Sequence, residues 1–177
     1  MTTFKESLLI LLFEFLGTLL LTSLYNSCFQ SADGAGLLCG FFVLLIFSAR
    51  ISGSHFNPAI TLAFMFRRDT GRFSRLLGLL YIAAQYAGAL LGAIISYNLF
   101  QANAKTPLTV GHNANDTVLL VQAMVMEMIG AMLITFLYLT QTEKDTKMSE
   151  DPAITTLIIA ATYVAVVSYS EVFGVSF

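Results

Sequence analysis

The feature that most constrains this chain is the run Ser-Gly-Ser-His-Phe-Asn-Pro-Ala-Ile at residues 52–60. Asn57 is predicted to cap a helix that begins at Pro58, because asparagine is a preferred N-cap residue and proline suits the first helical turn. The apolar stretch that ends at Phe66 has only nine residues, so it covers roughly 13 Å, less than half of a bilayer core of about 30 Å. A capped helix that cannot span is a half-helix, and half-helices at the membrane midplane usually line a path for a solute.

The composition indicates a membrane protein. Of the 177 residues, 56% are hydrophobic and 11% are charged, and the mean hydropathy is +0.76. The net charge of −2 gives no reason to expect a nucleic-acid partner, and the expected surroundings are a lipid bilayer. Cys28 and Cys39 could form a disulfide, but two packed or lipid-facing thiols are the favoured interpretation. No cleavable signal is evident, since the first apolar run is long enough to be a permanent span.

Five apolar runs are each near the ~17–25 residues that a spanning helix needs. They lie at about residues 7–28, 34–49 (extendable through Ile51), 76–100, 118–140 and 153–169. The fold class predicted is therefore all-α, a polytopic membrane helix bundle with five spanning helices plus one re-entrant half-helix.

The basic residues predict the orientation. Residues 1–5, 67–75 and 141–152 share one side of the membrane, and the opposite side, mainly residues 101–117, carries only Lys105. The shared side carries Lys5, Arg67, Arg68, Arg72, Arg75, Lys144 and Lys147. The positive-inside rule places this side, and the N-terminus, in the cytoplasm, with plasma membrane and endomembrane not distinguished. Asn115, in an Asn-x-Thr sequence, would then be an extracellular glycosylation acceptor.

This topology makes the opening motif a re-entrant loop. The second run reaches the cytoplasmic side near Arg50 and the third leaves it after Arg75, so the segment between them must enter and return on the same side. Residues 51–56 are predicted to dip in and the half-helix to climb out, which places Asn57 near the bilayer centre. Irregular backbone at that depth is tolerated only when it is buried in protein or lines a wet cavity.

The chain also contains an internal repeat. Residues 14–22, EFLGTLLLT, resemble residues 127–135, EMIGAMLIT, and the two runs cross the membrane in opposite directions, so the repeat is inverted. The predicted units are residues 1–100, with three spans and the loop 51–66, and residues 118–177, an incomplete second unit. An extracellular loop, residues 101–117, joins them. The sequence stops just before the expected counterpart of Asn57.

The motifs at residues 14–18, 53–61, 85–93 and 127–135 resemble the aquaporin, or major intrinsic protein, family. The resemblance implies a six-helix bundle with two Asn-Pro-Ala half-helices, usually a homotetramer with one pore in each subunit. The second half-helix and the sixth span are missing from this sequence. We expect a chain cut short, and the alternative is a natural end that another chain completes or that leaves the protein unable to conduct.

The expected function is passive passage of water or a small neutral solute. The amide of Asn57 and the positive end of the half-helix would orient the solute and oppose protons and cations. The expected pore-lining residues are Gly53, Ser54, His55, Asn57, Pro58 and Ala59. The structural alternative for the motif is an ordinary capped helix or turn.

Two acids stand inside apolar runs, where a charge is expensive and usually has a partner. A proton relay is one interpretation of Glu14 and Glu127. The favoured one, which the resemblance implies, is that Glu14 braces the loop that holds Asn57 and that Glu127 braces a second loop. Gly88 and Gly92 lie on a stripe of small residues that suits close helix packing.

The resemblance places an outer selectivity constriction at Leu37 (or Leu38), Val166 and Val175. These residues are aliphatic and fit neither a water-selective nor a glycerol-passing pattern, so the solute stays open. The main rival function is a non-conducting membrane scaffold that lacks the second half-pore. A secondary transporter would need more coupling side chains. We expect no enzyme, cofactor or metal site, because the sequence has no nucleophile–base pair, metal-ligand cluster or phosphate loop.

Overall fold

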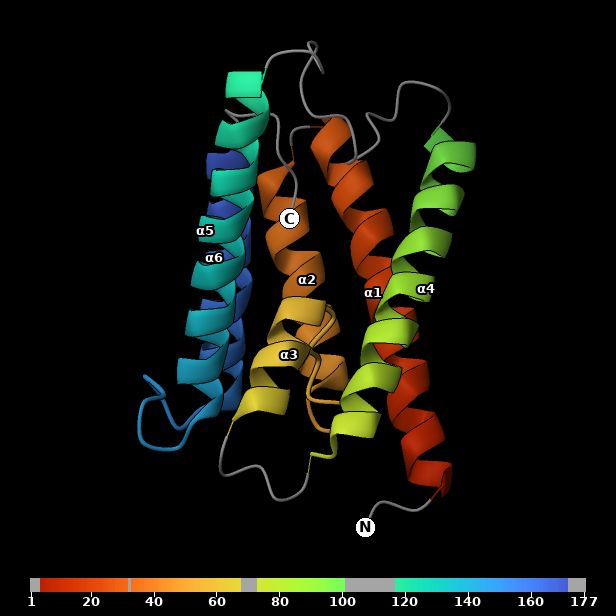
Figure 1. Cartoon of the computed structure of the whole chain (residues 1–177), viewed down its shortest axis with the longest axis vertical. Coiled ribbons are helices and arrows are strands. Elements are labelled where there is room, and N and C mark those ends of the chain that lie inside the picture. Colours follow the sequence, from red (N-terminus) through yellow and green to blue (C-terminus); the bar gives the residue numbers. More distant parts are fainter. Residues whose placement is uncertain (1–3, 32, 68–72, 101–116, 172–177) are drawn as a thin grey trace.

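The computed structural model describes residues 4–31, 33–67, 73–100 and 117–171, and it is helical throughout these ranges apart from turns and loops (Figure 1). The helices, in chain order, are α1 (Phe4–Ser31), α2 (Gly34–Ser48), α3 (Pro58–Phe66), α4 (Arg75–Phe100), α5 (Thr117–Thr142) and α6 (Pro152–Glu171). The prediction of an all-α helix bundle is confirmed, and the bounds predicted for α3 are those observed.

Helices α1, α4, α5 and α6 each contain a segment long and apolar enough to cross a membrane. Helix α2 has 15 residues and measures only about 22 Å at ~1.5 Å per residue. It ends at Ser48, but helix-like backbone hydrogen bonds continue to Ser52 and Gly53, which donate to the carbonyls of Ser48 and Ala49 at 3.0 and 3.2 Å. The second predicted span is therefore a short helix followed by one further turn.

The bundle has two long pairs of helices with α2 and α3 between them. Helix α1 packs on α4, α5 packs on α6, α2 contacts both α1 and α6, and α3 contacts both α4 and α5. Figure 1 shows the two long pairs on opposite sides, with α3 in one half of the bundle only. We call the end of the bundle at which α1 begins its N-terminal end.

Small residues bring α1 and α4 close together. A Cβ atom added at Gly88 would collide with the backbone carbonyl of Phe15, and one added at Gly92 would lie 2.5 Å from the carbonyl oxygen of Leu19. Any larger residue would hold the two backbones apart.

Large apolar side chains cover much of the outside of the bundle, as a membrane requires. Examples are Leu8, Phe47, Leu90 and Met128, all exposed. Cys28 is buried and Cys39 is exposed, and both thiols are free, which confirms the favoured prediction for the cysteines.

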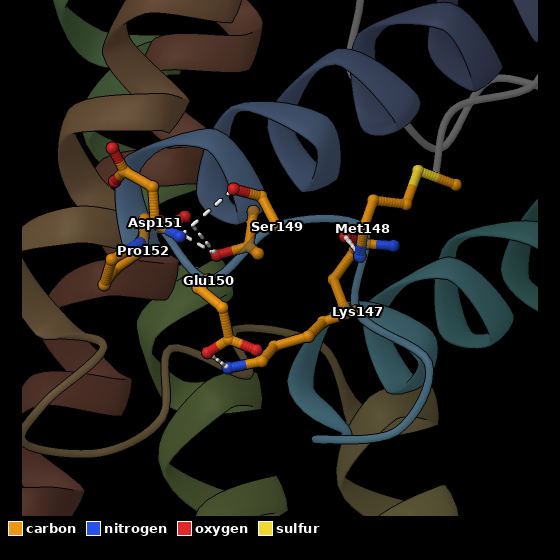
Figure 2. A network of polar contacts seen from close by, with 8 residues as sticks. Lys147, Met148, Ser149, Glu150, Asp151 and Pro152 are labelled. Atoms are coloured by element: carbon orange, nitrogen blue, oxygen red, sulfur yellow. Dashed lines mark hydrogen bonds and ion pairs between the residues drawn. The ribbon is translucent and has the colours of Figure 1, made fainter.

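A compact polar turn joins α5 to α6 (Figure 2). The carboxylate of Asp151 accepts a hydrogen bond from the backbone N–H of Ala153 at 2.8 Å, which caps the start of α6. Lys147 pairs with Glu150 at 2.6 Å, and the Ser149 hydroxyl accepts from the N–H of Asp151 at 3.1 Å. The short turn keeps α5 and α6 antiparallel neighbours.

Candidate functional site: the re-entrant loop and its cavity

The half-helix α3 begins at a complete N-cap. Asn57 has extended backbone angles, φ −146° and ψ 126°, and its side-chain oxygen accepts a hydrogen bond from the N–H of Ala59 at 2.8 Å. Pro58 occupies the first helical position, where its missing N–H costs nothing. The cap uses the oxygen of the Asn57 amide and leaves the amide nitrogen as a donor.

The loop before α3 turns through left-handed backbone. Gly53 has φ 86°, which glycine tolerates, but Ser54 and Phe56 have φ 58° and 46°. Positive φ is uncommon for residues other than glycine and costs of order 1–3 kcal/mol. Such a conformation persists only where the surroundings hold it.

Glu14 on α1 supplies part of that support. Its two carboxylate oxygens accept hydrogen bonds from the consecutive backbone N–H groups of His55, at 3.0 Å, and Phe56, at 2.9 Å. The Gln85 side chain on α4 donates to the same carboxylate at 2.8 Å and to the hydroxyl of Thr61 at 2.9 Å. Glu14 is fully buried, so one carboxylate satisfies loop donors that water cannot reach.

Serine side chains tie the loop to the end of α2. The hydroxyls of Ser48 and Ser54 are 2.6 Å apart, and the Ser54 hydroxyl also donates to the carbonyl of Leu45 at 2.9 Å. Ser54 is buried. These bonds satisfy a polar side chain whose backbone conformation is strained.

Two tyrosines hold the loop carbonyls. Tyr81 on α4 donates to the carbonyl oxygen of Ser52 at 2.7 Å. Tyr138 on α5 donates to the carbonyl oxygen of Gly53. The loop is thus fixed from α1, α2, α4 and α5 at once.

The Phe56 ring occupies space that is free only because residue 17 is glycine. Phe56 is buried, and a Cβ atom at Gly17 would collide with its ring. The absence of a side chain on α1 therefore makes room for the loop that α1 also braces.

A cavity of about 500 Å³ lies beside the start of α3. Its wall is mostly apolar and aromatic, with polar groups mainly from α1, the loop, α4 and α5. The polar members of the wall are Thr18, Thr22, Asn26, Ser54, His55, Asn57, Gln85 and Glu127. The aromatic members are Tyr25, Phe41, Phe56, Tyr86, Tyr97, Tyr138 and Tyr163. A mainly greasy wall with a few polar groups suits a small solute that makes few hydrogen bonds at a time.

Four of the residues expected to line a pore are on the cavity wall, namely Ser54, His55, Asn57 and Pro58. Gly53 and Ala59 are not among the residues that line the cavity. The carbonyl oxygen of Gly53 accepts a hydrogen bond from Tyr138, and Ala59 belongs to the first turn of α3.

Glu127 also lies on the cavity wall and is exposed. Leu37 and Val166 pack in the hydrophobic core and are not among the residues that line the cavity. Val175 and Asn115 lie outside the described residues.

Several site residues were not predicted from the sequence. Gln85 is a polar residue in an apolar span, the same signal that pointed to Glu14. Tyr81 and Tyr138 carry no such signal, since tyrosine is unremarkable in an apolar helix. Their role depends on which backbone carbonyls the loop presents to them.

Comparison with known proteins identifies a family that this chain matches. The family described as Major intrinsic protein matches residues 3–177. The chain is 37% identical to aquaporin-5 of Ovis aries over 129 residues, which is 71% of this chain and 46% of that protein. It is 44% identical to aquaporin-B of Dictyostelium discoideum over 70 residues, 38% of this chain and 23% of that protein.

A bacterial relative is more distant. The chain is 34% identical to the propanediol uptake facilitator PduF of Salmonella typhimurium over 100 residues, which is 50% of this chain and 37% of that protein. The chain spans less than half of the length of the aquaporin-5 relatives that it matches.

Proposed function

Because this chain belongs to the major intrinsic protein family, we propose that the protein is a passive transmembrane channel for water or a small neutral solute. It is an integral membrane protein, and the part of the chain that the structure describes contains four helices of spanning length. The observation that carries the proposal is the N-terminus of a half-helix, capped by Asn57, on the wall of a cavity of about 500 Å³. The names of the relatives, aquaporin and propanediol uptake facilitator, support the solute class.

Asn57 is the proposed contact for the solute. Its amide oxygen is used by the cap of α3, so its amide nitrogen can donate to a solute oxygen. The positive end of the α3 dipole lies at the same place and favours an oxygen lone pair over a cation. His55, Ser54 and Pro58 would complete this part of the path.

The remaining residues have supporting roles in the proposal. Glu14 braces the loop that carries Asn57, and Gly88 and Gly92 let α4 approach α1. Glu127 would brace a second loop, and Leu37, Val166 and Val175 would form the outer constriction. None of these roles requires a cofactor or a covalent step.

Orientation and assembly are also proposed. The basic residues at the N-terminal end of the bundle support a cytoplasmic location for that end under the positive-inside rule. The family resemblance favours a homotetramer in which each subunit has its own pore.

The test is stopped-flow shrinkage of proteoliposomes under an osmotic step, with Asn57→Asp as the diagnostic variant. Aspartate caps a helix as well as asparagine does, so α3 should remain, but its side chain has lost the donor. We expect fast shrinkage for the parent protein and a rate close to that of empty vesicles for Asn57→Asp.

Asn98→Asp is the matched control, because Asn98 is exposed on α4 and is not part of the cavity wall. It should shrink as fast as the parent. Shrinkage of the parent at the rate of empty vesicles, with permeability to small polyols also absent, would contradict the channel and favour the scaffold.

A further inference from the structure

The cavity ends toward the N-terminal end of the bundle at His55 and Tyr138. Both residues are part of its wall, whereas the three rings packed beyond them are not. Those rings belong to Phe64, Phe73 and Tyr81, whose centroids lie 4.6, 5.6 and 5.2 Å from that of His55. A solute that passed from the cavity toward the N-terminal end would therefore meet these aromatic side chains in the half of the bundle that contains α3.

Tyr138 is the member of this cluster that joins α5 to the loop. Its ring meets His55 edge-on at 5.8 Å and Phe64 edge-on at 5.9 Å. Its hydroxyl donates to the carbonyl oxygen of Gly53. Tyr138 is buried, with its ring packed against its neighbours and its hydroxyl hydrogen-bonded to the loop.

His55 is held in place from the other side. Its Nδ1 atom is 3.1 Å from the hydroxyl of Thr61 on α3, and its backbone N–H is bound by Glu14. The His55 side chain bonds to α3, which directly follows its own loop, whereas Tyr138 reaches the loop from a separate helix, α5, through its hydroxyl. Tyr138 is therefore the side chain that can move away without moving the loop backbone.

An ion pair also joins the end of α3 to the end of α5, close to Tyr138. Arg67, at the end of α3, pairs with Glu143, directly after α5. The Arg67 guanidinium also lies over the Phe64 ring, 5.9 Å from its centroid. The ends of α3 and α5 are thereby tied together beside Tyr138.

We propose that Tyr138 closes the N-terminal end of the cavity and that its hydrogen bond to the Gly53 carbonyl is the closing contact. This inference rests on the proposed function, since it concerns the path of the same solute. When Tyr138 swings away, the Gly53 carbonyl becomes free to accept a hydrogen bond from the solute. Gly53 would then line the path only in the open state.

The test is cysteine labelling, which needs no solute flux. The protein carries Cys28→Ala, Cys39→Ala and the reporter Ala89→Cys, because Ala89 is on the cavity wall. A membrane-impermeant methanethiosulfonate is applied to sealed vesicles from one face or the other. With Tyr138 present, we expect reaction from the face opposite the N-terminal end and at least tenfold slower reaction from the N-terminal end.

Tyr138→Phe and Tyr138→Ala separate the hydroxyl from the ring. Loss of a hydrogen bond with a net contribution of ~1 kcal/mol corresponds to about a fivefold change in an equilibrium. We expect Tyr138→Phe to speed labelling from the N-terminal end about fivefold, and Tyr138→Ala to speed it more. Tyr169→Ala, outside the cavity wall, should change nothing.

Labelling from the opposite face should be the same in every variant, which shows that each one is folded. The proposal is overturned if both Tyr138 variants leave the rate from the N-terminal end unchanged. It is also overturned if the parent already reacts equally from both faces. A protein that labels as expected but passes no water or polyol would count against the proposed channel alone.

Discussion

At the scale of single residues, Glu14 shows how an acidic side chain is retained inside a membrane helix. Its carboxylate takes two backbone N–H groups and the Gln85 amide. The two backbone N–H groups would otherwise be buried without a partner, and the cost of burying an unpaired donor exceeds the gain from an ordinary hydrogen bond. The carboxylate is therefore a structural part of the loop.

We predict that Glu14→Gln destabilises the protein by about 2 kcal/mol, because a glutamine amide replaces one acceptor by a donor among buried donors. Thermal unfolding in detergent measures this as a lowered midpoint. Glu150→Gln is the matched control, since Glu150 is exposed and makes only a surface ion pair with Lys147, which is worth little. Equal midpoints for Glu14→Gln and Glu150→Gln would show that the carboxylate does not hold the loop.

At the scale of helices, the contact of α1 with α4 depends on glycine. We predict that Gly88→Ala destabilises the bundle by about 1–3 kcal/mol, because the added methyl group meets the backbone carbonyl of Phe15, which cannot move aside as a side chain would. Thermal unfolding of the variant in detergent checks the size of the effect.

Gly34→Ala provides the comparison, since nothing lies within 4 Å of a Cβ atom at Gly34. Alanine is the better helix former by ~1 kcal/mol, so this variant should be neutral or slightly more stable. If Gly88→Ala behaves like Gly34→Ala, the two helices are not in the close contact described.

How far the sequence predicts the helices differs from element to element. The helix α3 follows from its cap and its length, because Asn57, Pro58 and an apolar run are local signals. The end of α2 is predicted to within one residue, because the apolar run stops at Ala49, just before Arg50, and the helix ends at Ser48. The hydrogen bonds of Tyr81 and Tyr138 to the loop are not predictable, because they join residues 29 and 85 positions apart in the chain, and no local pattern marks such partners.

At the scale of the whole molecule, the charge distribution predicts one orientation. Cysteines placed at the exposed positions Asp145, in the α5–α6 turn, and Asn98, at the other end of the bundle, report on the two faces. In intact cells, and in a background without Cys28 and Cys39, an impermeant thiol reagent should label Asn98→Cys at once. It should label Asp145→Cys only after the cells are permeabilised. The reverse pattern would overturn the cytoplasmic placement of the N-terminus.

The long-range clamp of the loop also has a consequence for how the protein is made. Gly53 and Tyr138 are 85 residues apart, and at roughly 5–20 residues per second a ribosome needs about 4–17 seconds to synthesise the chain between them. Throughout that interval the loop has left the ribosome with Glu14 but without Tyr138. Until α5 is inserted, the polar loop at residues 51–56 can bond to Glu14 but not to Tyr138. The translocation machinery must therefore shield this loop from lipid during that time.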